Sequence, residues 1–456
     1  MKTLIKNGTL VTPEGSLRGD LLMENGRIAR IEDEINCDCG VIDASEKLVL
    51  PGGVDVHTHT NLIIGGKRVS DGFYHGSLAA LAGGTTTIVD HPEAGAEESG
   101  LLDQPEMYLE RMQRECICDF SIHGVIHRTG EDIVSDMPEL IRKGFTSMKM
   151  YMTYASMLSD DEIASLLPVI TENGGLACFH AEDDSLINDL RKQYALEGKL
   201  SPIYHAKSRP NCTEADAVKR LIEISARCGN APIYIVHLST KEGLEIIRNA
   251  KSQGVNVIAE TCPQYLMLDE SRYEEPDGLK YIMAPPLRTE DDCEALWGGI
   301  SDGTIDVVAT DHCSYSYADK VKYGSDDFRN APGGAPGVET RLPLLFSEGV
   351  KRGRISLEQF VKLVSTSPAD IMGLGNRKGR IAPGYDADIL IWNSDAETVL
   401  SAERMQQRCD YTPFEGFEVT GMPETVFLRG KKVYDTAGFY AGKGNGEFIP
   451  RTKREY

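Results

Sequence analysis

Five apolar runs of the chain end in residues that can bind a metal ion or carry a proton. The residues at these ends are Asp55–His59, Lys149, His180–Glu182, His237–Ser239 and Asp311–Cys313. Neutral imidazoles and carboxylates together form a ligand set that suits zinc, and less often manganese or iron. These residue types predict a metal-dependent site that hydrolyses its substrate.

His57 and His59 form the first candidate ligand pair. Residues two apart on a strand project from the same face, so both imidazoles can hold one metal ion. The alternative is that they are two half-buried histidines of an ordinary strand. The metal site is favoured because His180, His237 and Asp311 are expected to reach the same rim from other strands.

Lys149 is the unusual member of the set. An ammonium group beside two divalent cations would be repelled, and burial would favour its neutral form. A neutral amine can add carbon dioxide to become a carbamate, whose two oxygens could bridge two metal ions. A buried salt bridge or a Schiff base is the alternative use of this lysine.

Asp311 could bind a metal ion, transfer a proton, or do both, because hydrolysis needs a base near the attacking oxygen. Its alternative role is to hold a histidine in one tautomer. His91 and His123 also lie on apolar runs, and we expect them to be hydrogen-bonded structural residues. His75 is expected on a helix surface.

The elements that position these residues alternate along the middle of the chain. Apolar, β-branched runs are separated by helix-like stretches, a pattern typical of parallel β/α units. Eight such runs lie between residues 48 and 313, the number that closes a (β/α)8 barrel. Catalytic residues of such barrels lie at the C-terminal ends of the strands. We therefore predict an α/β fold with a TIM-like barrel; the alternative is an open doubly wound sheet.

Both ends of the chain are rich in β-forming residues, which predicts one small β-sandwich domain built from the two termini. Asn-Gly pairs at 7–8 and 25–26 predict tight hairpin turns. The predicted boundaries are 1–50 and 376–435 for the two parts of the sandwich, 51–375 for the barrel, and 436–456 for a tail that could form an interface arm.

Composition excludes several classes of protein. The 456 residues carry 48 basic and 70 acidic side chains, a net charge of −22, which disfavours binding to nucleic acid or an anionic membrane. The 11 cysteines are scattered without a Cys-x-x-Cys pair, which argues against a disulfide framework. Neither a signal peptide nor a membrane-spanning run is expected, so the sequence predicts a soluble, cytoplasmic protein.

The motifs taken together resemble those of the cyclic amidohydrolases, in the hydantoinase and dihydropyrimidinase branch of the amidohydrolase superfamily. The similarity runs along nearly the whole chain, and its motifs follow the order of that branch. They are PGGVDVHTH at 51–59, SMKMYMTY at 147–154, FHAE at 179–182, IVHLS at 235–239, ETCPQYL at 260–266, PPLR at 285–288, ATDHC at 309–313, PGVE at 336–339 and YTPFEG at 411–416.

This resemblance implies a role for each candidate residue. His57, His59 and Asp311 would bind one zinc ion, His180 and His237 would bind a second, and N6-carboxylated Lys149 would bridge them. A hydroxide between the metals would attack the ring amide, and Asp311 would pass its proton to the leaving nitrogen. Tyr154 would donate a hydrogen bond to the developing oxyanion.

The resemblance also places two substrate contacts at positions where the residue differs from the family. Ala284 stands where serine is common, and Gly333 stands where asparagine is common. A backbone contact would survive at either position, whereas the contact of an asparagine side chain is lost. Asn61 stands where dihydroorotases carry an arginine, which disfavours that activity.

The expected function is that of a binuclear zinc cyclic amidase. Its substrate would be a cyclic ureide such as a D-5-substituted aryl hydantoin, opened to the N-carbamoyl amino acid. The alternatives are a dihydropyrimidinase, then an allantoinase, and manganese or another divalent ion in place of zinc. A catalytically silent assembly protein of the same fold is disfavoured because all six metal-site positions are intact. The resemblance further implies a homotetramer.

Overall fold

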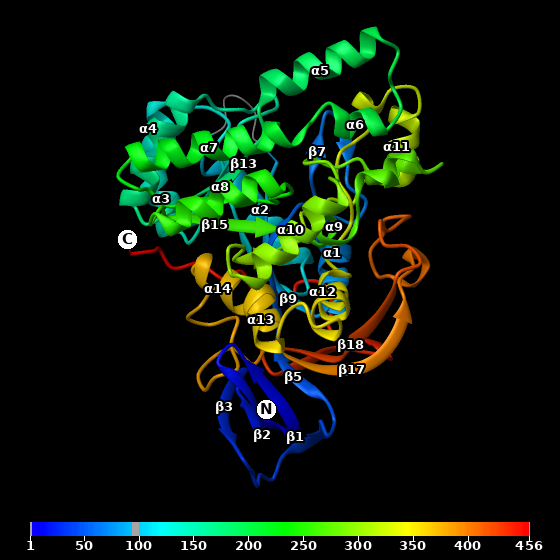
Figure 1. Ribbon diagram of the computed structural model, residues 1–456. Coiled ribbons are helices and arrows are strands. Elements are labelled where there is room, and N and C mark those ends of the chain that lie inside the picture. Colours follow the sequence, from blue (N-terminus) through cyan, green and yellow to red (C-terminus); the bar gives the residue numbers. More distant parts are fainter. Residues whose placement is uncertain (1, 94–99, 456) are drawn as a thin grey trace.

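The computed structural model describes residues 2–93 and 100–455, and its centre is a closed barrel of parallel strands (Figure 1). Each consecutive pair of barrel strands runs parallel, which confirms the predicted barrel. The strands are β6 (Gly53–Thr58), β9 (Thr85–Asp90), β10 (Asp119–Ile122) with its continuation β11 (Gly124–Val125), β12 (Ser147–Tyr151), β13 (Leu176–His180), β14 (Ile233–Ile235), β15 (Val257–Thr261) and β16 (Val307–Val308).

Hydrogen bonds close the ring between its first and last strands. Thr58, at the end of β6, forms a parallel bridge with His312, which follows β16. The backbone N–H of His59 donates to the carbonyl of His312 at 2.8 Å. The open doubly wound sheet is thereby excluded, since such a sheet has two free edges.

Helices cover the outside of the barrel (Figure 1), and their sequences explain where they form. In α4 the hydroxyl of Ser159 accepts a hydrogen bond from the backbone N–H of Glu162, and the carboxylate of Glu162 accepts one from the backbone N–H of Ser159. These two hydrogen bonds cap the first turn of the helix. One face of α4 is buried, with apolar residues at helical spacing: Ile163, Leu166, Leu167 and Ile170. No helix in the described ranges is long and apolar enough to cross a membrane.

The α-helices are α1 (Gly72–Ala82), α2 (Asp103–Glu115), α3 (Glu131–Arg142), α4 (Asp160–Glu172), α5 (Asp184–Leu196), α6 (Ile203–Lys207), α7 (Asn211–Arg227), α8 (Lys241–Ser252), α9 (Pro263–Met267), α10 (Glu290–Ser301), α11 (Tyr317–Gly324), α12 (Arg341–Leu345), α13 (Leu357–Val361) and α14 (Ser367–Ile371). Short 3-10 turns occupy Glu270–Glu274, Gly278–Tyr281, Phe328–Asn330 and Ala402–Arg404, and wider π-helical turns occupy Phe346–Lys351 and Lys362–Thr366.

A second sheet combines strands from both ends of the chain, as predicted, and lies below the barrel in Figure 1. The two ends meet where β5 pairs with β17 in antiparallel register. The exact domain boundaries stay predictions. The strands of this sheet are β1 (Lys2–Thr12), β2 (Gly15–Glu24), β3 (Arg27–Glu32), β4 (Gly40–Asp43), β5 (Leu48–Pro51), β17 (Ile389–Val399), β18 (Glu418–Leu428), β19 (Lys431–Asp435) and β20 (Gly438–Phe439).

One of the two predicted hairpin turns is wrong. Asn25 and Gly26 both have positive φ, at 53° and 83°, and connect β2 to β3. Asn7 and Gly8 instead lie inside β1, where the pairing with β2 shifts its register. The packing at this position leaves room only for glycine, because a Cβ atom on residue 8 would lie 2.5 Å from a methyl group of Val49.

The C-terminal tail packs against the barrel of its own chain. The backbone of Phe120 in β10 accepts from Ile449 at 2.8 Å and donates to Glu447 at 3.0 Å. The buried Arg451 guanidinium donates to the carbonyl of Ile122 at 2.6 Å and to the hydroxyl of Ser147 at 2.5 Å. The tail therefore holds β10 and β12 together, and its predicted role as an interface arm stays a prediction.

Arg341 connects three barrel strands around the closing seam. Its guanidinium donates to the carbonyls of Val54 at 2.9 Å and Val308 at 3.1 Å, and to the hydroxyl of Thr85 at 3.1 Å. Its Nε lies 3.9 Å from Asp55 Oδ2, and both side chains are fully buried. Because a buried charge without its partner is costly, this residue contributes to closing the barrel.

We expect Arg341→Met to destabilise the protein by about 3 kcal/mol, because it leaves Asp55 and several acceptors unpaired in the interior. Thermal and urea unfolding would measure the loss. Arg142→Met is the matched control, because the Arg142 side chain is 71% exposed and its ion-pair partner among the described residues is its helix neighbour Glu139. Equal stability of the two variants would contradict the role assigned to Arg341.

Candidate functional site

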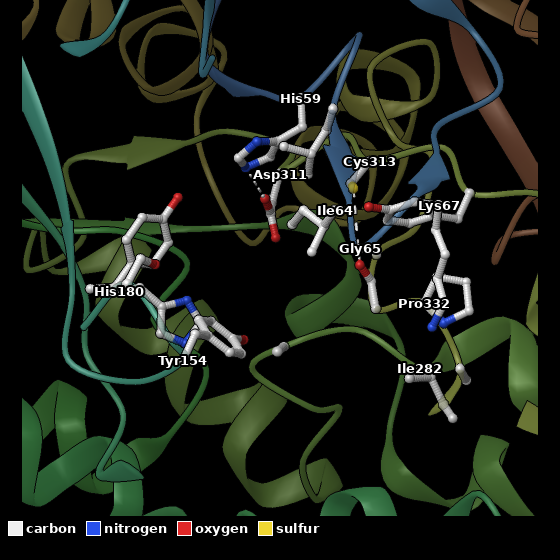
Figure 2. Close-up of a pocket in the computed structure, with 18 of the residues that line it drawn as sticks. His59, Ile64, Gly65, Lys67, Tyr154, His180, Ile282, Asp311, Cys313 and Pro332 are labelled. Atoms are coloured by element: carbon white, nitrogen blue, oxygen red, sulfur yellow. Dashed lines mark hydrogen bonds and ion pairs between the residues drawn. The ribbon is translucent and has the colours of Figure 1, made fainter. Parts of the chain in front are cut away.

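A cavity of about 660 Å³ opens at the C-terminal ends of the barrel strands. The residues predicted from sequence gather around it: His57, His59, Lys149, Tyr154, His180, His237, Ala284, Asp311 and Gly333. Figure 2 shows His59 and Asp311 beside each other, with His180 and Tyr154 on a neighbouring part of the wall. Residues up to 276 positions apart thus share one site, as expected for strands that end at one rim.

His57, His59 and Asp311 form the most compact group of the site. Nε2 of His57 and Nε2 of His59 each lie 3.2 Å from Oδ1 of Asp311. The imidazole of His237 lies beside them, with its ring centre 5.4 Å from that of His57. Burial and the charge of Lys149 lower the pKa of His57 well below its usual range, so this ring is neutral, the form that binds metal ions.

His180 is held by a buried chain of charges. Its Nε2 lies 2.7 Å from Oε2 of Glu182, and the same carboxylate oxygen accepts from the guanidinium of Arg209. Although burial alone would raise it, Arg209 holds the pKa of Glu182 well below its usual range. Because this carboxylate is ionised, it accepts a hydrogen bond from the Nε2–H of His180, which leaves Nδ1 as the ring nitrogen with a lone pair.

Lys149 lies fully inside the barrel, on β12. Burial lowers the pKa of its amine, although the carboxylates of Asp311 and Glu260 act in the opposite direction. Burial, and then the charges of His180 and Lys149, lower the pKa of His237 well below its usual range, so Lys149 lies close enough to the histidines to act on them electrostatically. A neutral amine at this place would be a nucleophile.

Glu260 is a functional residue that the sequence reasoning missed. Its Oε1 lies 2.6 Å from Nδ1 of His57 and accepts from the backbone N–H of His237 at 3.0 Å. Its Oε2 accepts from the hydroxyl of Tyr234 at 2.7 Å. Glu260 thus orients two candidate ligands, and it leaves Nε2 of His57 free to bind. Its position at the end of an apolar run was the available signal.

His91 lies closer to the candidate ligands than its predicted structural role required. Its ring centre is 4.6 Å from that of His57 and 4.9 Å from that of His59. On its other side it stacks on His123 at 3.9 Å. Nδ1 of His123 is hydrogen-bonded to the hydroxyl of Ser147 at 2.5 Å, which agrees with the structural role predicted for His123.

Three of the site residues have strained backbones. His237, Asp311 and Tyr154 have φ values of 40°, 53° and 73°, in the left-handed region that residues with a side chain rarely adopt. The loop of Tyr154 is fastened by Asp184, which accepts from the hydroxyl of Thr153 at 2.8 Å and from the backbone of Tyr154 at 3.2 Å. Such strain is typical of sites where the surrounding structure aims a side chain.

Ala284 and Gly333 line the cavity, as predicted, and one buried lysine holds their two segments together. Nζ of Lys320 donates to the carbonyl of Ile282 at 2.6 Å and to that of Pro332 at 3.1 Å. Gly333 has no neighbour where a Cβ would be, so its backbone is open to the cavity. Both segments can therefore offer backbone groups to a ligand.

The buried nitrogen atoms of the site fit a metal ion. Among the described residues, no hydrogen-bond partner is found for Nε2 of His57, Nδ1 of His59, Nε2 of His91 or Nδ1 of His237. The ligand atoms of His57, His59 and His91 lie within 4.8 Å of one another, as do those of His57, His237 and Asp311. Since buried polar atoms are normally satisfied, a cation is the partner that this set can accept.

Comparison with known proteins agrees with this geometry. The sequence model of the amidohydrolase family matches residues 48–433. A D-phenylhydantoinase of Escherichia coli is 43% identical over 453 residues, which cover 99% of this chain and 98% of that protein. The similarity therefore extends over both the barrel and the sheet built from the chain ends.

Solved structures give the same result. The dihydropyrimidinase of Brevibacillus agri superposes with a TM-score of 0.98 at 35% identity, and a D-hydantoinase of Bacillus sp. AR9 with 0.97 at 36%, each over 100% of both chains. The resemblance predicted from the motifs is confirmed. The chain belongs to the amidohydrolase family, as an enzyme of the hydantoinase and dihydropyrimidinase type.

Proposed function

We propose that this enzyme is a binuclear zinc cyclic amidase that opens the ring of a D-5-substituted hydantoin to the N-carbamoyl amino acid. The observation that carries the proposal is the convergence of buried imidazoles and Asp311 on one cavity floor, where ring nitrogens of these histidines lack a hydrogen-bond partner among the described residues. Its hydantoinase-type relatives agree with hydrolysis of a cyclic amide.

His57, His59 and Asp311 would hold one zinc ion, and His180 and His237 a second, with N6-carboxylated Lys149 bridging them. Zinc would polarise the ring carbonyl and make a water molecule more acidic, and manganese is the alternative ion. The buried, weakly basic amine of Lys149 supports its carboxylation by carbon dioxide.

Two side chains, those of Asp311 and Tyr154, would take part directly in the reaction. Asp311 Oδ1 lies against the two histidines, which leaves Oδ2 to take a proton from the attacking water and return it to the ring nitrogen. The hydroxyl of Tyr154 would donate to the amide oxygen as negative charge develops there. Backbone groups at Ala284 and Gly333 would hold the ring.

The cavity wall supports a substrate with an apolar ring substituent. Leu62, Ile63, Ile64 and Phe328 line the cavity and offer contacts to an aryl group. Dihydropyrimidines, and then allantoin, are the alternative substrates, since their rings contain the same ureide. The intact set of ligands disfavours a silent assembly protein. We further propose a cytoplasmic homotetramer, on the resemblance alone.

We expect the zinc- and bicarbonate-supplied enzyme to open D-5-phenylhydantoin faster than dihydrouracil, allantoin or dihydroorotate. Lys149→Ala should lower kcat/KM by about 1,000-fold, or ~4 kcal/mol, because the bridging group is lost. Lys199→Ala, on the surface, is the control. A preference for dihydrouracil would identify a dihydropyrimidinase, and turnover of none of the four rings would contradict the proposed substrate.

Metal analysis should find two zinc ions per chain in the wild-type protein. His57→Asn should lose at least one of them, because it leaves only His59 and Asp311 of the proposed ligands of that ion. His75→Asn, a change on α1 outside the cavity, should keep both. A wild-type chain that binds a single ion would contradict the binuclear site.

Tyr154→Phe should lower kcat by about 100-fold and change KM much less, because the hydroxyl acts on charge that develops in the transition state. Steady-state kinetics on the best substrate would test this. Tyr440→Phe is the control, since Tyr440 is exposed and directly follows β20 in the sheet built from the chain ends. A rise in KM alone would reduce Tyr154 to a substrate contact.

A further inference from the structure

The wall of the cavity is positively charged, although the chain as a whole has a net charge of −22. Besides Lys149, which belongs to the reaction centre, four cationic side chains line it: Lys67, Arg191, Arg209 and Arg329. The carboxylates on the described part of the wall are Asp311, which belongs to the reaction centre, and Glu93. This local excess of positive charge favours an anionic ligand.

Three of the four cations already have partners. Arg209 pairs with the buried Glu182, and Arg329 pairs with Asp327 at 2.6 Å. Lys67 donates to the carbonyl of Asn330 at 2.6 Å. Figure 2 shows Lys67 beside Pro332, on the side of the cavity away from His180.

Arg191 differs from the other three cations in its contacts. Its guanidinium donates to the carbonyl of Arg329 at 3.1 Å, and no carboxylate of the described residues lies within 4.0 Å. Arg191 also lines a second hollow of about 500 Å³, which shares Tyr154, Ala155 and Arg209 with the cavity. The carboxylate on the described wall of this hollow is Asp184, which accepts hydrogen bonds from the side chains of Thr153 and Asn188. The guanidinium is therefore accessible to a ligand rather than packed into the protein.

The surroundings of Arg191 disfavour the positive charge of its guanidinium unless an anion binds there. Partial burial lowers the pKa of its guanidinium, and so does repulsion from Arg209 and Arg329. An anion bound here would remove this repulsion. Guanidinium groups bind carboxylates through two parallel hydrogen bonds, which makes a carboxylate the best-matched anion.

The position of Arg191 relates this anion site to the reaction centre. Arg191 lies on α5, the helix that follows β13 and therefore follows His180 along the chain. Arg209 and Tyr154 line the same two hollows as Arg191, and the guanidinium of Arg209 is 5.7 Å from the ring of Tyr154, whose ring centre is 5.1 Å from that of His180. A group on a ring substituent that extends past Tyr154 would meet Arg191.

We infer that Arg191 forms a subsite for a carboxylate on the substituent of the ring, so that the preferred substrates are cyclic ureides with an acidic side chain. This inference rests on the proposed function and narrows its substrate class. Apolar residues such as Ile64 and Phe328 would contact the part of the substituent between the ring and the carboxylate.

The test compares each acidic substrate with its neutral amide of the same shape. The pairs are hydantoin-5-acetate, hydantoin-5-propionate and 5-(4-carboxyphenyl)hydantoin, each with the matching carboxamide, and 5-phenylhydantoin is the reference. For the pair of best-fitting length, kcat/KM should favour the carboxylate by at least about tenfold, mainly through KM.

Variants identify the residue responsible. Arg191→Gln should bring the carboxylate-to-amide ratio close to one, and Arg191→Lys should give an intermediate ratio, because one ammonium cannot form the paired hydrogen bonds. Lys192→Gln removes the same charge from the exposed neighbouring residue and should keep the wild-type ratio.

The outcomes separate this inference from the function on which it rests. Turnover of 5-phenylhydantoin without preference for any carboxylate would overturn the anion subsite and leave the proposed function intact. A carboxylate preference that persists in Arg191→Gln would also overturn it. Absence of turnover on every ring would contradict the proposed function itself, and the subsite with it.

Discussion

The closing contact between the first and last barrel strands is the constraint on which the site depends. The hydrogen bond from His59 to His312 fixes the end of β6 against the segment after β16, and so fixes His57 and His59 against Asp311. The ligands come from strands at opposite ends of the barrel sequence, so their distances are set by the ring of strands. Arg341 supports this seam from inside by bonding to both sides of it.

Buried carboxylates fix the orientation of candidate metal ligands at the ends of the barrel strands. Glu260 holds His57 and Glu182 holds His180, and each carboxylate also binds a second donor that keeps it in place. An imidazole whose one nitrogen is occupied in this way presents the other in a fixed direction. The strained backbones of His237 and Asp311 show that the tertiary structure, more than local preference, sets these directions.

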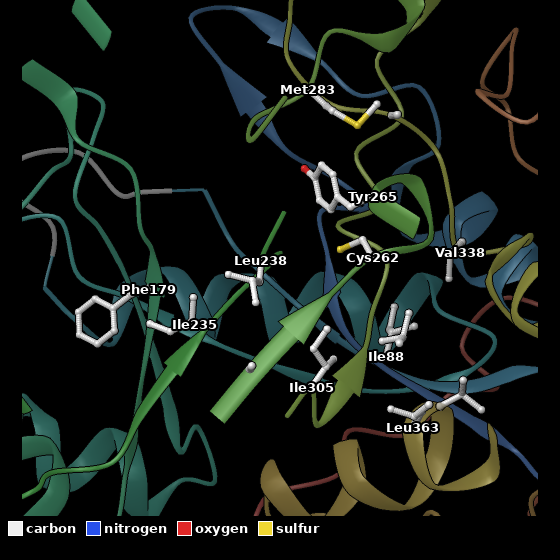
Figure 3. Close-up of a cluster of buried hydrophobic side chains, with 14 of the residues drawn as sticks. Ile88, Phe179, Ile235, Leu238, Cys262, Tyr265, Met283, Ile305, Val338 and Leu363 are labelled. Carbon is white, nitrogen blue, oxygen red and sulfur yellow. The ribbon is translucent and has the colours of Figure 1, made fainter. Parts of the chain in front are cut away.

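The wall of the cavity, which would face the ring substituent, is formed by other elements than the floor, where the candidate metal ligands lie. The floor is carried by strand ends deep in the barrel, whereas the wall is made by the β7 (Ile63–Ile64) and β8 (Lys67–Arg68) hairpin, α5 and the segments held by Lys320. Figure 3 shows part of the apolar core around the barrel strands, which includes Ile235 of β14 and Leu238 just after it. Loops and helices on such a scaffold can change their side chains without disturbing the ligands. In the proposed function, substrate choice would therefore rest on wall residues such as Arg191, and the hydrolytic chemistry on residues at the strand ends.

The sequence by itself determined the barrel, the sheet of both chain ends and the list of candidate ligands. These rest on local signals: the alternation of apolar runs, the polar residues at their ends, and motifs such as the one at 51–59. The sequence could not show that Glu260 holds His57, that Asn7 and Gly8 form a bulge, or that no carboxylate of the described residues forms an ion pair with Arg191. Each of these depends on a neighbour far along the chain, such as Val49 beside Gly8 or Glu260 beside His57, so only the folded chain decides it.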